Sequence, residues 1–304
     1  MVPASAGMAT RWGMTAVANA LRDRIAGGGL VTLMAAHNPL SARLAEEAGF
    51  DGIWASGFEL SAAYGVPDAS LLSFTTHLEM TRAIIEQVLV PLVADLDTGY
   101  GNAINVRHVV GAYARAGSAA VVIEDKTFPK DTSLLPGARQ ELVRVEEFQG
   151  KIAAAREAGA GHDLLVIART EALIADLGIA EALRRGEAYA EAGAELLLIH
   201  SKRTNPDEIV AFTGRWPGRV PLVIVPTAYP QLTEAKIRAL GKISIVIYAN
   251  HAVRAAVGAM RETFAAIRRD GGIHRVDKRI ASVEDIFELQ RVAAMKAAEK
   301  KYLR

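Results

Sequence analysis

The sequence contains no cysteine among its 304 residues. This absence excludes disulfide bonds, metal sites with thiolate ligands, and any catalytic step that uses a cysteine as nucleophile, acid or base. A metal site in this chain must therefore be built from oxygen donors or from imidazole nitrogen.

The chain also lacks an excess of charge of either sign, since 35 Lys and Arg residues stand against 34 Asp and Glu residues. A net charge of +1 gives no electrostatic attraction to nucleic acid or to an anionic membrane. No apolar run approaches the roughly 20 residues needed to span a bilayer, and residues 1–20 lack the pattern of a signal peptide. We therefore expect a cytoplasmic protein whose partners are small molecules or other subunits, not nucleic acid or membrane. We expect residues 1–14 to form a loose tail.

Short, continuous apolar runs recur along the chain, and segments with helical spacing lie between them. Continuous runs are typical of parallel strands buried on both faces. Eight such strands alternating with helices predict a (β/α)₈ TIM barrel, with residues 15–304 forming one domain that includes a C-terminal helical extension. An open doubly wound sheet would alternate in the same way, but its G-x-G-x-x-G motif is absent. We predict long helices over residues 251–270 and 282–304. The predicted strands are 30–36, 51–56, 92–97, 119–125, 164–170, 195–201, 221–227 and 243–250.

The carboxyl ends of these strands carry the polar residues, whereas the amino ends show nothing comparable. Barrel enzymes place their chemistry on loops at the carboxyl ends of the strands. We therefore expect the active site at this end. The residues concerned are Ser56, Asp95, Asp97, Glu124, Arg169, His200, Thr227 and Asn250.

Asp95 and Asp97 stand two residues apart at a strand end, so their carboxylates should point to the same side. Glu124 at the end of the next strand would add a third oxygen donor. Such a set favours Mg²⁺ over zinc, with Mn²⁺ or Co²⁺ as other candidates. The alternative is structural: Asp97 would cap the following helix, and Asp95 would pair with Arg169.

Arg169 follows an apolar strand and is either a buried salt-bridge partner or a clamp for carboxylate or phosphoryl oxygens. His200 also ends a strand, where a histidine can be structural or catalytic. Asp68 follows a proline in a turn, where a solvated aspartate is the usual role. Lys130, together with Thr132 and Ser133, belongs to a loop of about fifteen residues, and loops of that length are commonly functional lids.

Five motifs of the sequence together resemble the phosphoenolpyruvate mutase and isocitrate lyase superfamily over about residues 28–290. They are GFDGIWASG, ADLDTGYGN, VVIEDKTFPKDTS, VIARTEA and LIHSK. The resemblance implies a (β/α)₈ barrel whose eighth helix is exchanged with a neighbouring subunit. It also implies a homo-oligomer, usually a tetramer.

The loop after the fourth strand distinguishes the branches of this superfamily. The lyases carry a KKCGH-like motif whose cysteine acts as acid or base, whereas this chain reads EDKTFPKDTS. The resemblance therefore implies the branch that cleaves the carbon–phosphorus bond of phosphonopyruvate. Mutases of this branch read EDKLFPKTNS, with asparagine where this chain has Thr132. We therefore expect hydrolysis to pyruvate and phosphate, with phosphoryl transfer to give phosphoenolpyruvate as the alternative. A carbon–carbon lyase or a non-catalytic binding barrel is a remote alternative.

The resemblance also implies roles for individual residues. Asp95 would ligate Mg²⁺ directly, while Asp97 and Glu124 would hold metal-bound waters. The catalytic set would be Asp68, Lys130, Thr132, Arg169 and His200. The residues contacting a small anionic substrate would be Trp54, Ser56, Gly57, Phe58, Ser133, Leu134, Arg169 and His200, where Phe58 replaces a leucine common in the family.

Overall fold

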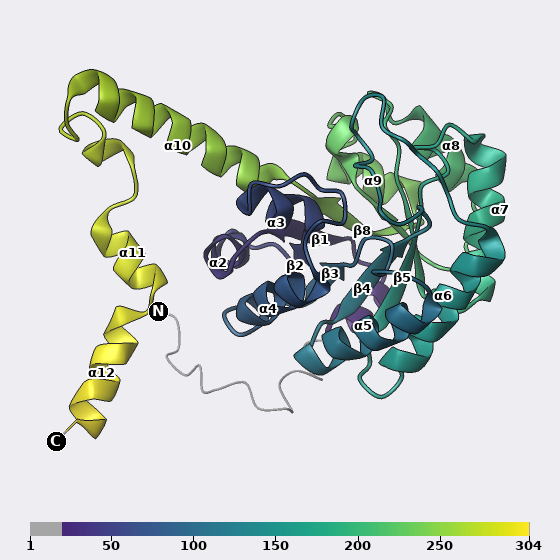
Figure 1. The fold of residues 1–304 in the computed structure, drawn as a ribbon, viewed down its shortest axis with the longest axis horizontal. Helices are drawn as coiled ribbons and strands as arrows, with labels where there is room; N and C mark the ends of the chain where they lie inside the picture. Colours follow the sequence, from purple (N-terminus) through teal and green to yellow (C-terminus); the bar gives the residue numbers. More distant parts are fainter. Residues whose placement is uncertain (1–19, 304) are drawn as a thin grey trace. The chain divides into compact units, whose positions relative to one another are not determined.

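A computed structural model describes residues 20–303 and contains eight parallel strands that close into a barrel (Figure 1). Each strand pairs with the next along the chain, and β8 closes the barrel by pairing with β1. The predicted strands and the predicted TIM barrel are confirmed. The strands are β1 Val31–Ala36, β2 Gly52–Ala55, β3 Leu92–Asp95, β4 Ala120–Glu124, β5 Leu165–Thr170, β6 Leu196–Ile199, β7 Leu222–Ile224 and β8 Ile243–Tyr248.

Helices surround the barrel, and their ends follow local sequence signals. Asn38, Ser73 and Asn102 cap helix N-termini with their side chains, which satisfies free backbone N–H groups. Gly117 and Gly241 end helices in the left-handed conformation. The helices are α2 Pro39–Glu47, α3 Gly57–Ala63, α4 Phe74–Ile85, α5 Ala103–Ala116, α6 Val145–Gly159, α7 Gly178–Glu191, α8 Asp207–Arg215 and α9 Glu234–Leu240, with a 3₁₀ turn at Pro226–Ala228.

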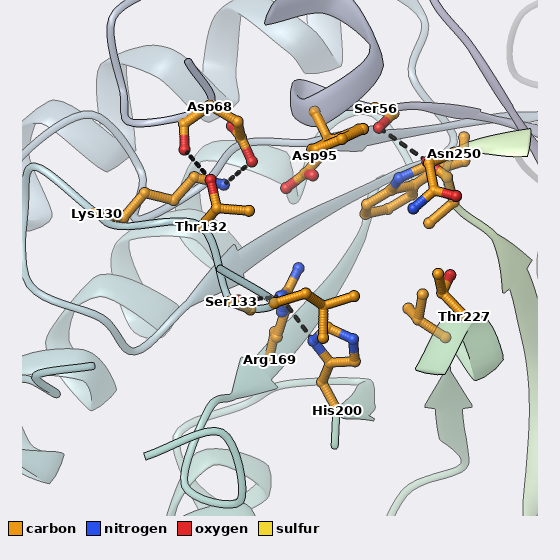
Figure 2. A pocket seen from close by; sticks show the side chains of 15 residues that line it. Ser56, Asp68, Asp95, Lys130, Thr132, Ser133, Arg169, His200, Thr227 and Asn250 are labelled. Carbon is orange, nitrogen blue, oxygen red and sulfur yellow. Dashed lines mark hydrogen bonds and ion pairs between the residues drawn. The ribbon is translucent and has the colours of Figure 1, made fainter. Parts of the chain in front are cut away.

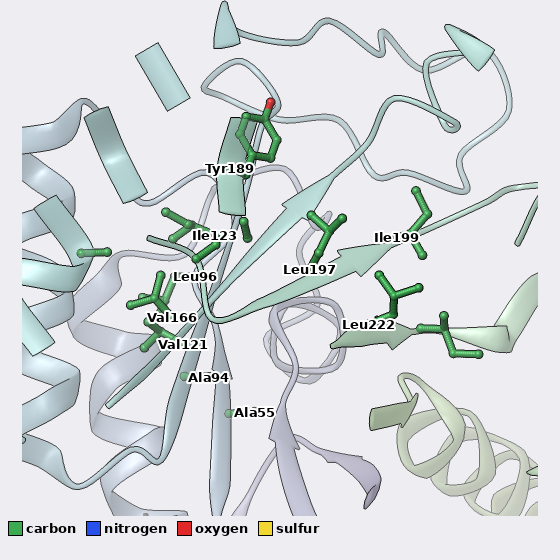
Figure 3. Close-up of a cluster of buried hydrophobic side chains, with 14 of the residues drawn as sticks. Ala55, Ala94, Leu96, Val121, Ile123, Val166, Tyr189, Leu197, Ile199 and Leu222 are labelled. Carbon is green, nitrogen blue, oxygen red and sulfur yellow. The ribbon is translucent and has the colours of Figure 1, made fainter. Parts of the chain in front are cut away.

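The continuous apolar strands are explained by two separate cores, because successive side chains of a strand point to opposite faces. One face of each strand packs against the helices, as Val121 and Ile123 of β4 do (Figure 3). The other face fills the barrel interior, to which Ala120 and Val122 of the same strand contribute. Both faces are therefore apolar, and no alternation is visible in the sequence.

The same period of two aims polar residues into the mouth of the barrel. Trp54, Val93, Val122, Ile167 and Leu198 belong to the interior core. The residue two positions further along each of these strands therefore also faces inward, at the carboxyl end. These residues are Ser56, Asp95, Glu124, Arg169 and His200.

Contacts within the chain define two compact units, one ending at His251 and the other beginning at Ala252. The second unit contains most of α10 (His251–Asp270), a 3₁₀ turn at Asp277–Arg279, α11 (Val283–Leu289) and α12 (Val292–Tyr302). The predicted helix over 251–270 is confirmed. The single helix predicted for 282–304 is wrong, because Arg291 adopts a left-handed conformation (φ 55°) and breaks it in two.

Two other predictions concern the N-terminal tail and the number of domains. The tail predicted for residues 1–14 lies outside the described residues. The single domain predicted for 15–304 stays a prediction. Among residues 20–303, no helix has the length and apolarity to cross a membrane.

Candidate active site

A cavity of about 170 Å³ opens at the carboxyl end of the barrel (Figure 2). That volume is similar to cavities that hold a benzene-sized ligand, so the site fits a small molecule. Every predicted catalytic residue lines it, as do all predicted substrate contacts except Gly57. Thr227 and Asn250, which had no predicted role, line the side opposite Asp68 and Lys130. The lining residues are Trp54, Ser56, Phe58, Asp68, Asp95, Lys130, Thr132, Ser133, Leu134, Arg169, His200, Val225, Thr227, Ala249 and Asn250.

Three carboxylates converge on Gly57, the first residue of α3. A Cβ atom at position 57 would lie 3.0 Å from Asp97 Oδ1, 3.5 Å from Asp95 Oδ2 and 3.7 Å from Asp68 Oδ1. Asp68 is buried, so the solvated role expected for a turn aspartate is wrong. Asp97 adopts a left-handed backbone conformation (φ 50°), which aspartate tolerates better than most residues. It does not cap α5, whose N-cap is Asn102.

Lys130 is the cation at the centre of this acidic group. Its Nζ lies 2.6 Å from Asp97 Oδ1, 3.2 Å from Asp68 Oδ2 and 4.0 Å from Glu124 Oε1. Burial acts to lower the pKa of Lys130, but Asp97 and the other carboxylates outweigh it and raise this pKa well above its usual value. Lys130 is therefore held in its ammonium form.

Burial and mutual repulsion disfavour the ionised form of these acidic side chains. Burial raises the pKa of Asp97 to about 8, and the neighbouring carboxylates add to this effect while Lys130 opposes it. Burial also raises the pKa of Asp95. A divalent cation would compensate this charge, because a nearby positive charge favours the ionised form of a carboxyl group.

The oxygen donors of these side chains are of the kind that Mg²⁺ prefers. Within residues 20–303, no three His, Asp or Glu side chains are arranged so that all could ligate one metal ion directly. Mg²⁺ usually keeps several waters and takes only one or two carboxylates directly. Asp95 lines the pocket and suits direct ligation. Asp97 and Glu124 are buried and do not line the pocket, and neither oxygen of Glu124 accepts a hydrogen bond from the described residues.

Arg169 and His200 form a second group of polar side chains that line the pocket. Arg169 Nε lies 2.6 Å from Glu171 Oε1 and 3.2 Å from Glu124 Oε2, so its ion-pair partners are these two residues, and the alternative pairing with Asp95 is not what the structure contains. Arg169 Nη2 lies 3.1 Å from His200 Nδ1. Burial is the main cause that lowers the pKa of His200.

The contact with Arg169 fixes the tautomer of His200. A guanidinium group can only donate hydrogen bonds, so Nδ1 of the neutral imidazole accepts and Nε2 carries the proton. Glu171 Oε1 also lies near Nδ1, but at 3.5 Å it is the weaker partner. His200 Nε2 is buried without a partner among the described residues, so it is available to donate to a ligand oxygen.

The loop between β4 and α6 is held against the segment that carries Asp68. Thr132 Oγ1 donates a hydrogen bond of 2.8 Å to the backbone carbonyl of Asp68. Ser133 Oγ donates to Glu171 Oε2 at 2.5 Å and accepts from Arg169 Nη2 at 3.0 Å. The Ser133 hydroxyl is thus committed to the protein. Leu134 adds an apolar contribution to the pocket wall.

The sequence reasoning missed three buried charged residues around this site: Lys126, Glu171 and Asp125. Asp125 accepts hydrogen bonds from Tyr189 (2.7 Å), from the Glu171 backbone N–H (2.8 Å) and from Arg185 (3.1 Å). Its neighbour Glu124 faces inward, so the alternation of the strand aims Asp125 outward at α7. This alternation is the sequence signal that could have distinguished the inward-facing Glu124 from the outward-facing Asp125.

Comparison with known proteins finds relatives that match most of the chain. A sequence model described as phosphoenolpyruvate phosphomutase matches residues 21–268. The chain is 65% identical over 285 residues to phosphonopyruvate hydrolase of Variovorax sp. (strain Pal2), covering 94% of this chain and 98% of that protein. It is 44% identical to phosphoenolpyruvate phosphomutase of Tetrahymena pyriformis, covering 93% and 94%. A crystal structure of phosphonopyruvate hydrolase with oxalate and Mg²⁺ superimposes with a TM-score of 0.90 at 63% identity, covering 94% and 99%.

Proposed function

The chain belongs to the phosphoenolpyruvate phosphomutase family of enzymes, and from that premise we propose that it hydrolyses the carbon–phosphorus bond of 3-phosphonopyruvate to pyruvate and phosphate. The observation that carries the proposal is the identity of 65% with a phosphonopyruvate hydrolase, against 44% with a phosphomutase of similar length. The absence of cysteine argues further against the lyase chemistry of the superfamily.

Asp95 would hold Mg²⁺ directly, with Asp97 and Glu124 holding its waters. Bound there, Mg²⁺ would act as a Lewis acid toward the carboxylate and carbonyl oxygens of the substrate and stabilise the pyruvate enolate as it leaves. Oxalate, which is bound with Mg²⁺ in the crystal structure of the relative, carries a comparable pair of oxygens. This relationship supports Mg²⁺ as the cofactor here.

Arg169 and His200 would hold the phosphoryl group. Phosphoryl transfer passes through a loose, metaphosphate-like state that depends on positioning and electrostatic support. Arg169 offers a planar fork of donors to phosphoryl oxygens, and the Nε2–H of His200 adds a further donor. Lys130 adds a fixed positive charge at the boundary with the carboxylates.

Thr132 would orient the attacking water. A hydroxyl has one donor and two acceptor sites. Its proton is committed to the Asp68 carbonyl, so the oxygen can accept a hydrogen bond from a water molecule in the pocket. The water oxygen would then bond to phosphorus as the carbon–phosphorus bond breaks. One proton of the water would remain on the phosphate, and the enolate carbon would take up the other to give pyruvate. The loop of residues 124–140 would act as the gate over this site.

The exposed apolar surface of the second unit supports a homo-oligomer. Phe264 of α10 is 61% exposed and Phe287 of α11 is 49% exposed. Large exposed apolar side chains that gather on one unit commonly mark protein contacts. We propose a tetramer made of dimers that exchange these helices.

The proposal is tested by mixing the purified chain, phosphonopyruvate and Mg²⁺, and measuring pyruvate and inorganic phosphate separately. We expect the two products in equal amounts, with no turnover in excess chelator. Phosphoenolpyruvate as the main product would instead support the mutase. Turnover of a carbon–carbon substrate alone would support a lyase.

A further inference from the structure

Lys126 follows Asp125 in the loop after β4 and is one of the most buried charged residues in the described chain, with 1% exposure. Its Nζ donates to the backbone carbonyl of Asp131 at 2.7 Å and to Ser133 Oγ at 2.9 Å. Asp131 and Ser133 are the two neighbours of Thr132. The buried ammonium group of Lys126 therefore binds the chain on both sides of Thr132, the residue proposed to orient the attacking water.

The carboxylate of Glu171 is the counter-ion of Lys126. It also contacts Arg169, the proposed clamp for the phosphoryl group. Its carboxylate lies 3.4 Å from Lys126 Nζ, accepts from Ser133 Oγ at 2.5 Å, and lies 2.6 Å from Arg169 Nε. Burial acts to raise the pKa of Glu171, but the positive charges of Arg169 and Lys126 hold it well below its usual value. Glu171 is therefore ionised and contacts the loop and the clamp at once.

We propose that Lys126, held by Glu171, is a positioning residue that fixes Thr132 of the loop relative to Arg169 of the phosphoryl clamp. This inference rests on the proposed function, because it explains what holds Thr132 in the position that hydrolysis requires. Lys126 itself does not line the pocket. It acts through the backbone of Asp131 and the hydroxyl of Ser133.

A purely stabilising role fits these contacts less well. Buried ion pairs contribute little net stability, because removing two charges from water offsets their attraction. They do impose a defined geometry, and an error of about 1 Å in the position of a reacting group can lower a rate about 10²-fold. The contacts of Lys126 are with the loop itself, where geometry matters most.

The test compares Lys126→Met with a matched control, Lys242→Met. Lys242 also bridges backbone carbonyls, donating to Thr213 at 3.0 Å and to Trp216 at 2.6 Å, but it stands at the amino end of β8. Two readouts are used: the kcat for phosphate release, and the rate of tryptic cleavage after Arg139. The Arg139 side chain lies in the loop and is 53% exposed, so this cleavage reports loop opening without requiring activity.

We expect Lys126→Met to lower kcat by about 10²-fold. We also expect it to speed cleavage after Arg139 by about 10- to 100-fold, the factor for losing charge-assisted hydrogen bonds. Oxalate with Mg²⁺ should slow this cleavage in the wild type and fail to do so in the variant. Lys242→Met should leave both readouts at wild-type values. Lys126→Gln, which keeps a donor but not the charge, is measured alongside in case the Met variant does not fold.

Wild-type cleavage and wild-type kcat in a folded Lys126 variant would overturn the proposal. So would equal effects of Lys126→Met and Lys242→Met, which would indicate a general effect of losing a bridging lysine. If the wild type releases no phosphate from phosphonopyruvate, the proposed function fails. The cleavage assay then still decides whether Lys126 holds the loop.

Discussion

Replacing Thr132 by valine removes the hydroxyl and keeps the branched shape of the side chain. In the structure, this hydroxyl lines the pocket and donates to the Asp68 carbonyl at 2.8 Å. Valine can neither hold that carbonyl nor accept a hydrogen bond from a water molecule. Thr132→Ser keeps both abilities and serves as the conservative variant.

The loss of one preorganised hydrogen-bonding group in an active site lowers turnover by about 10²- to 10³-fold, or about 2.7–4 kcal/mol of transition-state stabilisation. We expect Thr132→Val to fall in this range and Thr132→Ser to retain most of the activity. We also expect the fall in kcat for Thr132→Val to exceed any rise in KM, because the water contact matters in the transition state.

The assay is continuous detection of phosphate released from phosphonopyruvate at saturating Mg²⁺. Thr127→Ala is the matched control, since Thr127 lies in the same loop and its hydroxyl donates at 3.5 Å to the Glu141 carbonyl, away from the pocket lining. Wild-type turnover of Thr132→Val would refute the role of Thr132 in orienting water. An equal loss in Thr127→Ala would point to the loop as a whole and not to this hydroxyl.

Three further predictions concern other parts of the molecule. Asp95→Asn should abolish metal-dependent turnover, and a full rate in excess chelator would contradict the metal site. Arg169→Lys keeps the charge but loses the fork that contacts Glu171, Ser133 and His200, so we expect a loss of about 10²-fold in kcat/KM; intact activity would mean that the clamp is misassigned. Burial lowers the pKa of His77 from 6.5 to about 4, so the unfolded state binds a proton that the folded state does not. Stability is then fully present above pH 6.5 and falls as the pH drops toward 4, with a loss of about 2 kcal/mol between pH 7 and 5. Unfolding measured at both pH values should show that His77→Gln loses this part of the acid sensitivity, and an unchanged difference would contradict it.

The barrel could be predicted because its signal is carried by every strand. Eight continuous apolar runs fit parallel strands covered on both faces, and polar residues gather only at their carboxyl ends. The C-terminal segment shows the limit of this reasoning. The helical spacing of 282–304 continues through Arg291, and only the backbone conformation at that residue shows that the helix breaks there.

The residues of the candidate site could be predicted from the sequence. Which of them form ion pairs with one another could not. The sequence placed Arg169 at a strand end, yet it left open whether Arg169 pairs with Asp95, and the structure gives it Glu171 and Glu124 instead. Which acid meets which base depends on strand register and loop path, and neither can be read from spacing. The role of Lys126 could not be predicted for the same reason, since its partners lie five and seven residues away along an irregular loop.

The central claim is that this chain cleaves the carbon–phosphorus bond and gives the phosphoryl group to water. Phosphorus NMR of phosphonopyruvate mixed with the enzyme and Mg²⁺ tests it directly, because substrate, phosphoenolpyruvate and phosphate give separate signals. We predict that the substrate signal is replaced by that of inorganic phosphate. Conversion to phosphoenolpyruvate, or a substrate signal that does not change, would contradict the claim.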